Sequence, residues 1–248
     1  VSWSRGLGDV YKRQTISFVS SGPGNPDLLT VQAVKRISDA DIIFYDDLSA
    51  GEILNLAKKS ATLLSVGKRA GLASPQQNQV SRLLVEYGRT GKKIVRLKSG
   101  DSSIFSRLEE EITALNENGL EFEIIPGVSS AMAAAAAAKI PLTRRVMSRR
   151  VQFITGHDFN GELPDDLNIA SLIDPNCTTV IFMGKKTFPN LAQILLENGL
   201  DIKTKVLVAE DISRKSENIT QGTIEEILIY LKAMQSNNPA VIIFGPLL

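Results

Sequence analysis

The sequence predicts an α/β protein built from two αβ halves. Short runs of β-favouring residues alternate with helical patterns along the first half, and the same alternation resumes after an alanine-rich helix and a basic segment. In the first half, this alternation predicts a parallel sheet with crossover helices. Each strand run is followed by a polar or glycine-rich turn. Because ligands lie beyond the carboxyl ends of parallel strands, these turns mark the candidate site.

Composition excludes several classes of partner. The chain of 248 residues has 28 Lys and Arg against 27 Asp and Glu, which leaves no electrostatic footprint for nucleic acid or a membrane surface. The apolar runs are all shorter than the roughly 18 residues of a membrane span, and no signal-peptide pattern is present. A single Cys177 and a single His157 provide neither a disulfide framework nor a metal cluster. We therefore expect a soluble, cytoplasmic protein without metal.

The first 14 residues, VSWSRGLGDVYKRQ, read as the translation of a transposon adapter used in sequencing libraries. We expect residues 1–14 to be a non-native segment and exclude them from the fold. The segment contains three basic residues and one acidic residue, so without it the formal net charge changes from +1 to −1.

The stretch ISFVSSGPGNPDLLT (16–30) is predicted to be a buried strand, a tight turn and the start of a helix. The glycines of 22–24 tolerate positive φ, and the proline between them cannot continue a central strand. Asn25 occupies the expected N-cap and Pro26 the first helical position. The stretch lacks the G-x-G-x-x-G pattern, which argues against a dinucleotide cofactor.

The remaining elements follow the same two periodicities. Further strands are expected at 42–45, 63–66, 94–97, 122–125, 151–155, 179–183, 206–209 and 240–244. Helices are expected at 52–58, 78–89, 107–118, 129–139, 188–198 and 223–234. The polar segment 160–176 is expected to be a loop or lid, and 144–150 a basic connector.

Several side chains at strand ends have types suited to chemistry. Asp46 can accept a proton or hold a hydroxyl or amine, whereas Asp47 should point the other way because strand side chains alternate. Lys68 can donate a proton or bind a carboxylate. A capping carboxylate and a solvated lysine are the alternatives. The amides and carboxylate of 99–101 suit the polar end of an amino-acid-like or nucleoside ligand. Five arginines suit acidic substrate groups or a solvated linker: Arg107, Arg144, Arg145, Arg149 and Arg150.

Several ordered motifs together resemble the tetrapyrrole (corrin/porphyrin) methylase family over residues 15–248. They are VSSGPGNPDLLT (19–30), DADIIFYDDLSAGEIL (39–54), VGKRAG (66–71), VRLKSGDSSIFSRLEEE (95–111), IIPGVSSAMAAAAAAKIPLTRR (124–145), FITGH (153–157) and TTVIFMGKKT (178–187). The resemblance implies an N-terminal αβ domain at 15–128, a C-terminal αβ domain at 129–248 and an active site in the cleft between them. It also implies a homodimer that uses S-adenosylmethionine to methylate uroporphyrinogen III twice. The product would be precorrin-2, a precursor of sirohaem and cobalamin.

The resemblance also implies roles for single residues. Asp46 would be the proton acceptor, Lys68 the proton donor, and Arg107 and Arg144 would bind the acidic substrate. The expected cofactor contacts are Pro23, Ser99, Gly100, Asp101, Ile104, Ser129, Ser130, Met183, Ile212 and Ala240. These roles are chemically consistent, because methylating an electron-rich pyrrole carbon leaves a cationic ring that must lose a proton.

The chain also departs from the family pattern. The motif G-G-D-P-F-I-F-G-R-G-G-E-E appears here as S-G-D-S-S-I-F-S-R-L-E-E-E (99–111), which reduces backbone freedom. Arg144 stands where the family has histidine, and Ile212 where it has a small residue. The alternatives are therefore a methylase of another precorrin, of RNA or of a diphthine intermediate, and a cofactor-binding homologue with weakened catalysis. The near-neutral charge argues against RNA.

Overall fold

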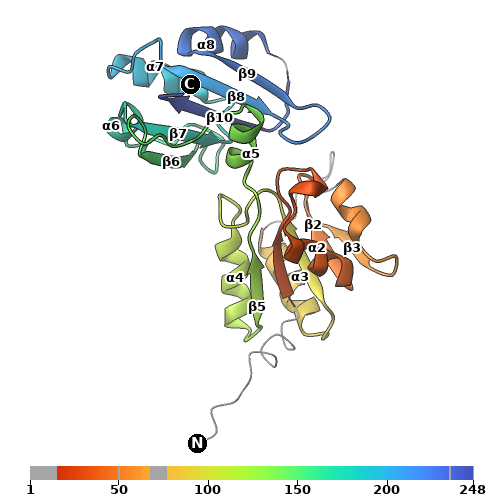
Figure 1. The fold of residues 1–248 in the computed structure, drawn as a ribbon. Helices are drawn as coiled ribbons and strands as arrows, with labels where there is room; N and C mark the ends of the chain where they lie inside the picture. The colour runs from red at the N-terminus through yellow and green to blue at the C-terminus, as the bar shows by residue number, and fades with distance from the viewer. Residues whose placement is uncertain (1–15, 50, 68–76, 235, 248) are drawn as a thin grey trace, which may run out of the picture. The chain divides into compact units, whose positions relative to one another are not determined.

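The structure is a computed structural model that describes residues 16–49, 51–67, 77–234 and 236–247. The described residues divide into two compact units, of which the first ends at Ser129 and the second begins at Ser130 (Figure 1). The predicted adapter segment, 1–14, and Lys68 lie outside the described residues. Among the helices of the described ranges, none combines the length and the apolar character needed to cross a membrane.

Five parallel strands form the sheet of the first unit. They are β1 (Ile16–Ser20), β2 (Ile42–Tyr45), β3 (Thr62–Ser65), β4 (Ile94–Lys98) and β5 (Phe122–Ile125). Their order is β3-β2-β4-β1-β5, and each neighbouring pair runs parallel. This confirms the predicted parallel sheet, and it brings the carboxyl ends of all five strands to one edge.

Apolar residues of the first unit alternate between the two faces of its sheet. Ile42 and Phe44 belong to one buried cluster and Ile43 to the other, because successive strand side chains point to opposite faces. The helices are η1 (Pro26–Leu28), α2 (Val31–Asp39), η2 (Glu52–Leu56), α3 (Gln77–Gly88) and α4 (Leu108–Glu117). Side chains of α3 and α4 complete the first cluster, and side chains of α2 and η2 complete the second.

The helix expected directly after Asn25 is divided in two, which corrects the sequence prediction. Asn25 does act as an N-cap and accepts a hydrogen bond from the Asp27 amide, but it caps the short 3-10 helix η1. Leu29 then adopts an extended conformation and ends that turn. The long helix α2 begins at Val31, and the Thr30 side chain caps it by accepting from the Ala33 amide.

The second unit contains a mixed five-stranded sheet. Its strands are β6 (Arg150–Thr155), β7 (Cys177–Phe182), β8 (Lys205–Glu210), β9 (Asn218–Thr223) and β10 (Ala240–Gly245). The order is β6-β7-β10-β8-β9, in which β6 and β7 are parallel and the other neighbours are antiparallel. The strand β9 was not predicted, because this edge strand has the polar sequence NITQGT and lacks a clear apolar alternation.

Four helices accompany this sheet in the described part of the second unit. They are α5 (Ser130–Ala137), α6 (Ile169–Leu172), α7 (Phe188–Glu197) and α8 (Ile224–Ala233). The segment 160–176, expected to be a loop, contains the single turn of α6, which Asn168 caps. Thr223 and Glu226 form a capping box at the start of α8, so this helix begins one residue after Thr223.

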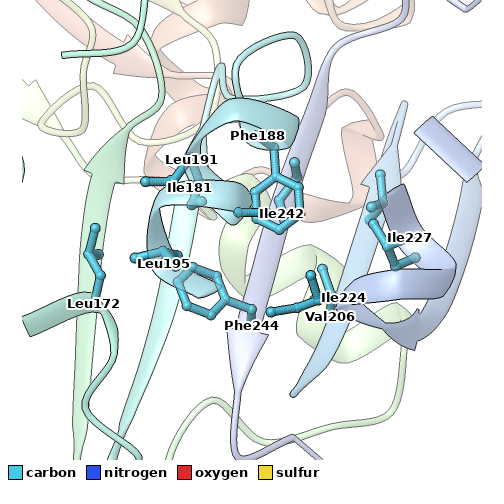
Figure 2. Packing of buried hydrophobic residues seen from close by; sticks show 12 residues of the cluster. Leu172, Ile181, Phe188, Leu191, Leu195, Val206, Ile224, Ile227, Ile242 and Phe244 are labelled. Atoms are coloured by element: carbon cyan, nitrogen blue, oxygen red, sulfur yellow. The ribbon is translucent and has the colours of Figure 1, made fainter. Parts of the chain in front are cut away.

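The core of the second unit lies between the sheet and helices α7 and α8 (Figure 2). The rings of Phe188 and Phe244 pack with their centroids 6.3 Å apart and their planes tilted by 53°, and Ile242 packs beside them. Ile227 of α8 is 1% exposed, whereas Ile229, two residues later on the same helix, is 67% exposed. One face of α8 therefore anchors the helix to the sheet.

The substitution Ile227→Ala should lower the free energy of unfolding by about 2–5 kcal/mol, because it removes buried methyl groups and leaves a cavity. Chemical denaturation followed by circular dichroism measures this loss. The matched control is Ile229→Ala, which should change the stability by less than about 0.5 kcal/mol. Equal losses for the two variants would contradict the assignment of the buried face.

Candidate functional site

Hydrogen bonds join the turns at the carboxyl edge of the first sheet. Gly22, after β1, and Gly100, after β4, exchange two backbone hydrogen bonds of 3.1 and 2.8 Å. Both have a φ of +66°, a left-handed conformation that glycine adopts without steric cost. Pro23 follows Gly22, and Ser99 precedes Gly100. The structure thus brings these predicted cofactor contacts into adjacent turns.

Asp101 connects the turn after β4 to the turn after β5. One carboxylate oxygen, Oδ2, accepts a 3.0 Å hydrogen bond from the Gly127 amide, and Oδ1 accepts a 2.8 Å bond from the Ser103 amide. The Ser103 hydroxyl also donates to Oδ1. Partial burial alone would raise the pKa of Asp101, but these hydrogen bonds outweigh it and hold the pKa below its ordinary value. The ionised carboxylate of Asp101 therefore connects the two turns through its hydrogen bonds.

Asp46, the predicted proton acceptor, has a defined orientation after β2. The Ser49 amide donates a 2.9 Å hydrogen bond to its Oδ1 atom, and the Asp46 amide donates to the Ser49 hydroxyl over 2.9 Å. Its other oxygen, Oδ2, lies 3.6 Å from the Nη1 atom of Arg96. The Asp46 side chain is 30% exposed, so the carboxylate is fixed but still accessible.

Beneath this edge, three charged side chains are buried among the residues of the first unit that the structure describes. Glu111 of α4 is completely buried, and its Oε1 atom lies 2.9 Å from Lys98 Nζ and 3.3 Å from Arg96 Nη2. Arg96 also donates a 2.7 Å hydrogen bond to the Leu97 carbonyl. Burial lowers the pKa of Lys98. The negative charge of Glu111 acts in the opposite direction, but the effect of burial is larger. With Asp46, the cluster contains two cations and two carboxylates.

Arg96, Lys98 and Glu111 were not among the residues predicted for the site. A signal was present, since Arg96 and Lys98 stand two residues apart in the apolar run IVRLK and must share one face of the strand. Two cations on one face of a buried strand require a carboxylate partner. The sequence does not identify that partner, because the first turn of α4 contains three consecutive glutamates and only the helix orientation selects Glu111.

The turn after β3 lies against the turn after β2. A Cβ atom on Gly67 would come within 2.7 Å of both the amide nitrogen and the Oδ1 atom of Asp47, so this close approach requires glycine. Asp46 and Asp47 thus have different neighbours. The predicted proton donor, Lys68, lies outside the described residues, and its role stays a prediction.

Ile104 and Arg107 continue the turn that begins at Ser99. The Ile104 amide donates to the Asp101 carbonyl over 3.1 Å. Arg107 has a φ of +58° at the N-cap of α4, and its exposed guanidinium makes two hydrogen bonds, of 2.6 and 2.8 Å, to Glu110. A substrate carboxylate would have to compete with Glu110 for this arginine.

The second unit brings three predicted cofactor contacts to one edge of its own sheet. Met183 follows β7, Ile212 follows β8 by two residues, and Ala240 begins β10 between these strands. Met183 is 43% exposed and has a φ of +56°. Non-glycine residues held in this conformation tend to cluster at functional sites. Ile212 is buried.

The other predicted residues lie near the boundary between the two units or in a hairpin. Ser129 is buried, and Ser130 is the first residue of α5, which packs against β10. Arg144 and Ser148 exchange two backbone hydrogen bonds, and the Arg144 Nη1 atom lies 3.9 Å from Met147 Sδ. Substrate binding by Arg144 stays a prediction.

The chain belongs to the tetrapyrrole (corrin/porphyrin) methylases, whose family model matches residues 15–228. A curated relative, the uroporphyrinogen-III C-methyltransferase of Methanocaldococcus jannaschii, is 37% identical over 231 residues, which cover 93% of this chain and 95% of that protein. A siroheme synthase of Chromobacterium violaceum is 39% identical over 231 residues, 93% of this chain and 48% of that protein. The chain thus spans about half the length of the siroheme synthases that it matches.

Solved structures support the same family. The uroporphyrin-III C-methyltransferase of Thermus thermophilus, in complex with S-adenosylhomocysteine, has a TM-score of 0.78 and 30% identity, covering 93% of this chain and 97% of that chain. A cobalt-precorrin-4 methyltransferase has a TM-score of 0.83 and 25% identity, with 95% of each chain covered. The predicted fold class is thereby confirmed.

Glu111→Gln should destabilise the protein by about 3–5 kcal/mol, because it leaves two buried cations without their shared carboxylate. Denaturant unfolding measures the change. Glu110→Gln is the matched control: it removes an exposed pair with Arg107, so the expected loss is below about 1 kcal/mol. A Glu111 variant as stable as the control would show that the buried cluster is not needed for folding.

Asp101 should make stability depend on pH in the acid range. Its pKa is lower in the folded protein than in the unfolded chain, so the ionised form stabilises the fold above the unfolded-chain value of about 3.9. This contribution is lost as the pH falls through the lower, folded value. Urea midpoints of wild type and Asp101→Asn should therefore differ more at about pH 7 than at about pH 2. The same difference at both pH values would exclude this linkage.

Proposed function

We propose that the chain is an S-adenosylmethionine-dependent C-methyltransferase that methylates uroporphyrinogen III twice and so produces precorrin-2. The family membership and the named relatives support this activity. The observation that carries the proposal is Asp46, a fixed and accessible carboxylate at the carboxyl edge of a parallel sheet. This is the edge at which α/β proteins bind their ligands.

The residues at the two sheet edges fit S-adenosylmethionine, which supplies a methyl group on a sulfonium centre when it is bound. The first unit offers the hydroxyl of Ser99, which can donate to a carboxylate or accept from an ammonium, in a turn that the Gly22–Gly100 pair holds in place. The second unit offers the exposed side chain of Met183, an apolar and polarizable surface. We propose that these groups bind the co-substrate.

Asp46 has the properties of a proton acceptor in this reaction. Methylation of a pyrrole carbon leaves a cationic ring, and a carboxylate beside that ring can take up the proton that is lost. The Ser49 amide fixes the direction of the Asp46 carboxylate, and Arg96 provides a cation 3.6 Å from its other oxygen. We propose that Lys68, Arg107 and Arg144 serve the acidic substrate.

A second candidate is methylation of a later precorrin on the same fold. The similarity to a cobalt-precorrin-4 methyltransferase, with a TM-score of 0.83, favours it. The higher sequence identity to uroporphyrinogen-III methyltransferases, 37% and 30% against 25%, makes uroporphyrinogen III the first choice. A homodimer, a cytoplasmic location and a shared cleft stay predictions; light scattering after size-exclusion chromatography tests the dimer.

In the direct test, the full chain is incubated with S-adenosylmethionine and uroporphyrinogen III under anaerobic conditions, and the mass of the product is measured. Two methyl additions are expected. Asp46→Asn should reduce the rate by at least about 100-fold, because general-base catalysis contributes about 10²–10⁴-fold. Affinity for S-adenosylhomocysteine, measured by calorimetry, should stay at the wild-type value.

The exposed neighbour Asp47 provides the control, since Asp47→Asn keeps the Asp46 carboxylate and should retain activity. No mass gain with a folded wild-type protein that binds S-adenosylhomocysteine would exclude the proposed activity. Parallel losses of affinity and rate in Asp46→Asn would exclude the role of Asp46 as proton acceptor.

A further inference from the structure

Two serines outside the predicted contacts fix the turn after β4. Ser102 is completely buried, and its amide donates a 2.8 Å hydrogen bond to the Ser20 hydroxyl. The Ser20 hydroxyl in turn donates to the Ser102 hydroxyl over 3.0 Å. Because Ser20 is the last residue of β1, this reciprocal pair fastens the turn to the end of the neighbouring strand.

Ser103 completes a second connection. Its amide and its hydroxyl both donate to Oδ1 of Asp101, while Oδ2 of Asp101 accepts from the Gly127 amide. The Ser103 hydroxyl thus helps to fix the carboxylate rotamer that reaches the turn after β5. The Ser102 and Ser103 side chains together link the turn after β4 to the end of β1 and to the turn after β5.

The backbone of this turn needs such support. Phe105 and Arg107 have φ values of +47° and +58°, which cost energy in residues with a Cβ atom. Conformations of this kind persist only where the surrounding contacts determine them. The Ser106 hydroxyl donates to the Ser102 carbonyl, so the strained part of the turn is tied to the same buried serine.

We propose that Ser102 and Ser103 are positioning residues that hold the segment 99–104 in the conformation that binds the co-substrate. This inference rests on the proposed function. At Ser102 the family pattern quoted above has proline, whose ring fixes the backbone φ angle, and at Ser103 it has phenylalanine. Here, hydrogen bonds to Ser20 and Asp101 provide the restriction instead.

The test uses the full chain and S-adenosylhomocysteine as the probe. Ser103→Ala should weaken binding measured by calorimetry about 5-fold, the equivalent of one hydrogen bond of about 1 kcal/mol. The Ser103 and Gly127 amides should exchange hydrogen about 5-fold faster in the same variant, since their acceptor is less well fixed. Ser103→Thr keeps the hydroxyl at an exposed position and should restore both values.

Ser102→Ala should act in the same direction, because it deletes the hydroxyl to which the Ser20 hydroxyl donates. Ser38→Ala is the control: this exposed serine donates to the Lys35 carbonyl in α2, and its removal should change neither affinity nor exchange at Gly127. In the methyl-transfer assay, the two positioning variants should raise KM for S-adenosylmethionine more than they lower kcat.

Two results would overturn the positioning role. One is unchanged exchange in Ser103→Ala, and the other is faster exchange with unchanged S-adenosylhomocysteine affinity, which would indicate a structural role alone. The proposed function fails separately, if the wild type binds S-adenosylhomocysteine but does not methylate uroporphyrinogen III. If the wild type binds no S-adenosylhomocysteine, both the proposed function and the positioning role are excluded.

Discussion

The candidate site of the first unit depends on the buried carboxylate of Glu111. Arg96 and Lys98 project from one face of a central strand into the protein interior, where an uncompensated cation costs several kcal/mol. Glu111 compensates both, and Arg96 extends the network to Asp46 at the surface. The position of the Asp46 carboxylate is therefore linked to the position of helix α4. A buried ion network of this kind is weak evidence for stability, but it restricts how the helix can pack against the sheet.

The parallel sheet supplies the second constraint. Its five carboxyl ends lie at one edge, and the turns that leave them are joined by Gly22 with Gly100 and by Asp101 with Gly127. These links use backbone groups that would otherwise be unpaired. In the second unit, antiparallel pairing of β10 with β7 and β8 places Met183, Ile212 and Ala240 at one edge although they are far apart in the chain. Parallel pairing in the first unit and antiparallel pairing in the second thus both bring residues that are far apart in the chain to one edge of a sheet.

Local patterns predicted much of the fold, and the errors have physical causes. The strands at Ile42–Tyr45 and Phe122–Ile125 have the predicted bounds, because apolar runs between polar turns are strong signals. The polar edge strand β9 was missed, since its pairing with β8 depends on main-chain hydrogen bonds that any sequence can make. Asn25 was correctly predicted to be a cap, but Leu29 ends the turn that it caps and Thr30 begins the long helix.

By itself, the sequence determined the alternation of strands and helices, the turns at the strand ends and the family to which they belong. Such features are set by short-range periodicity and by the backbone preferences of glycine and proline. Only the tertiary structure decided that Glu111, among three consecutive glutamates, neutralises Arg96 and Lys98, and that Ser102 and Ser103 fasten the turn after β4. These partners are selected by the packing of α4 and β1 against β4, and sequence separation carries no information about which side chains then lie within hydrogen-bonding distance.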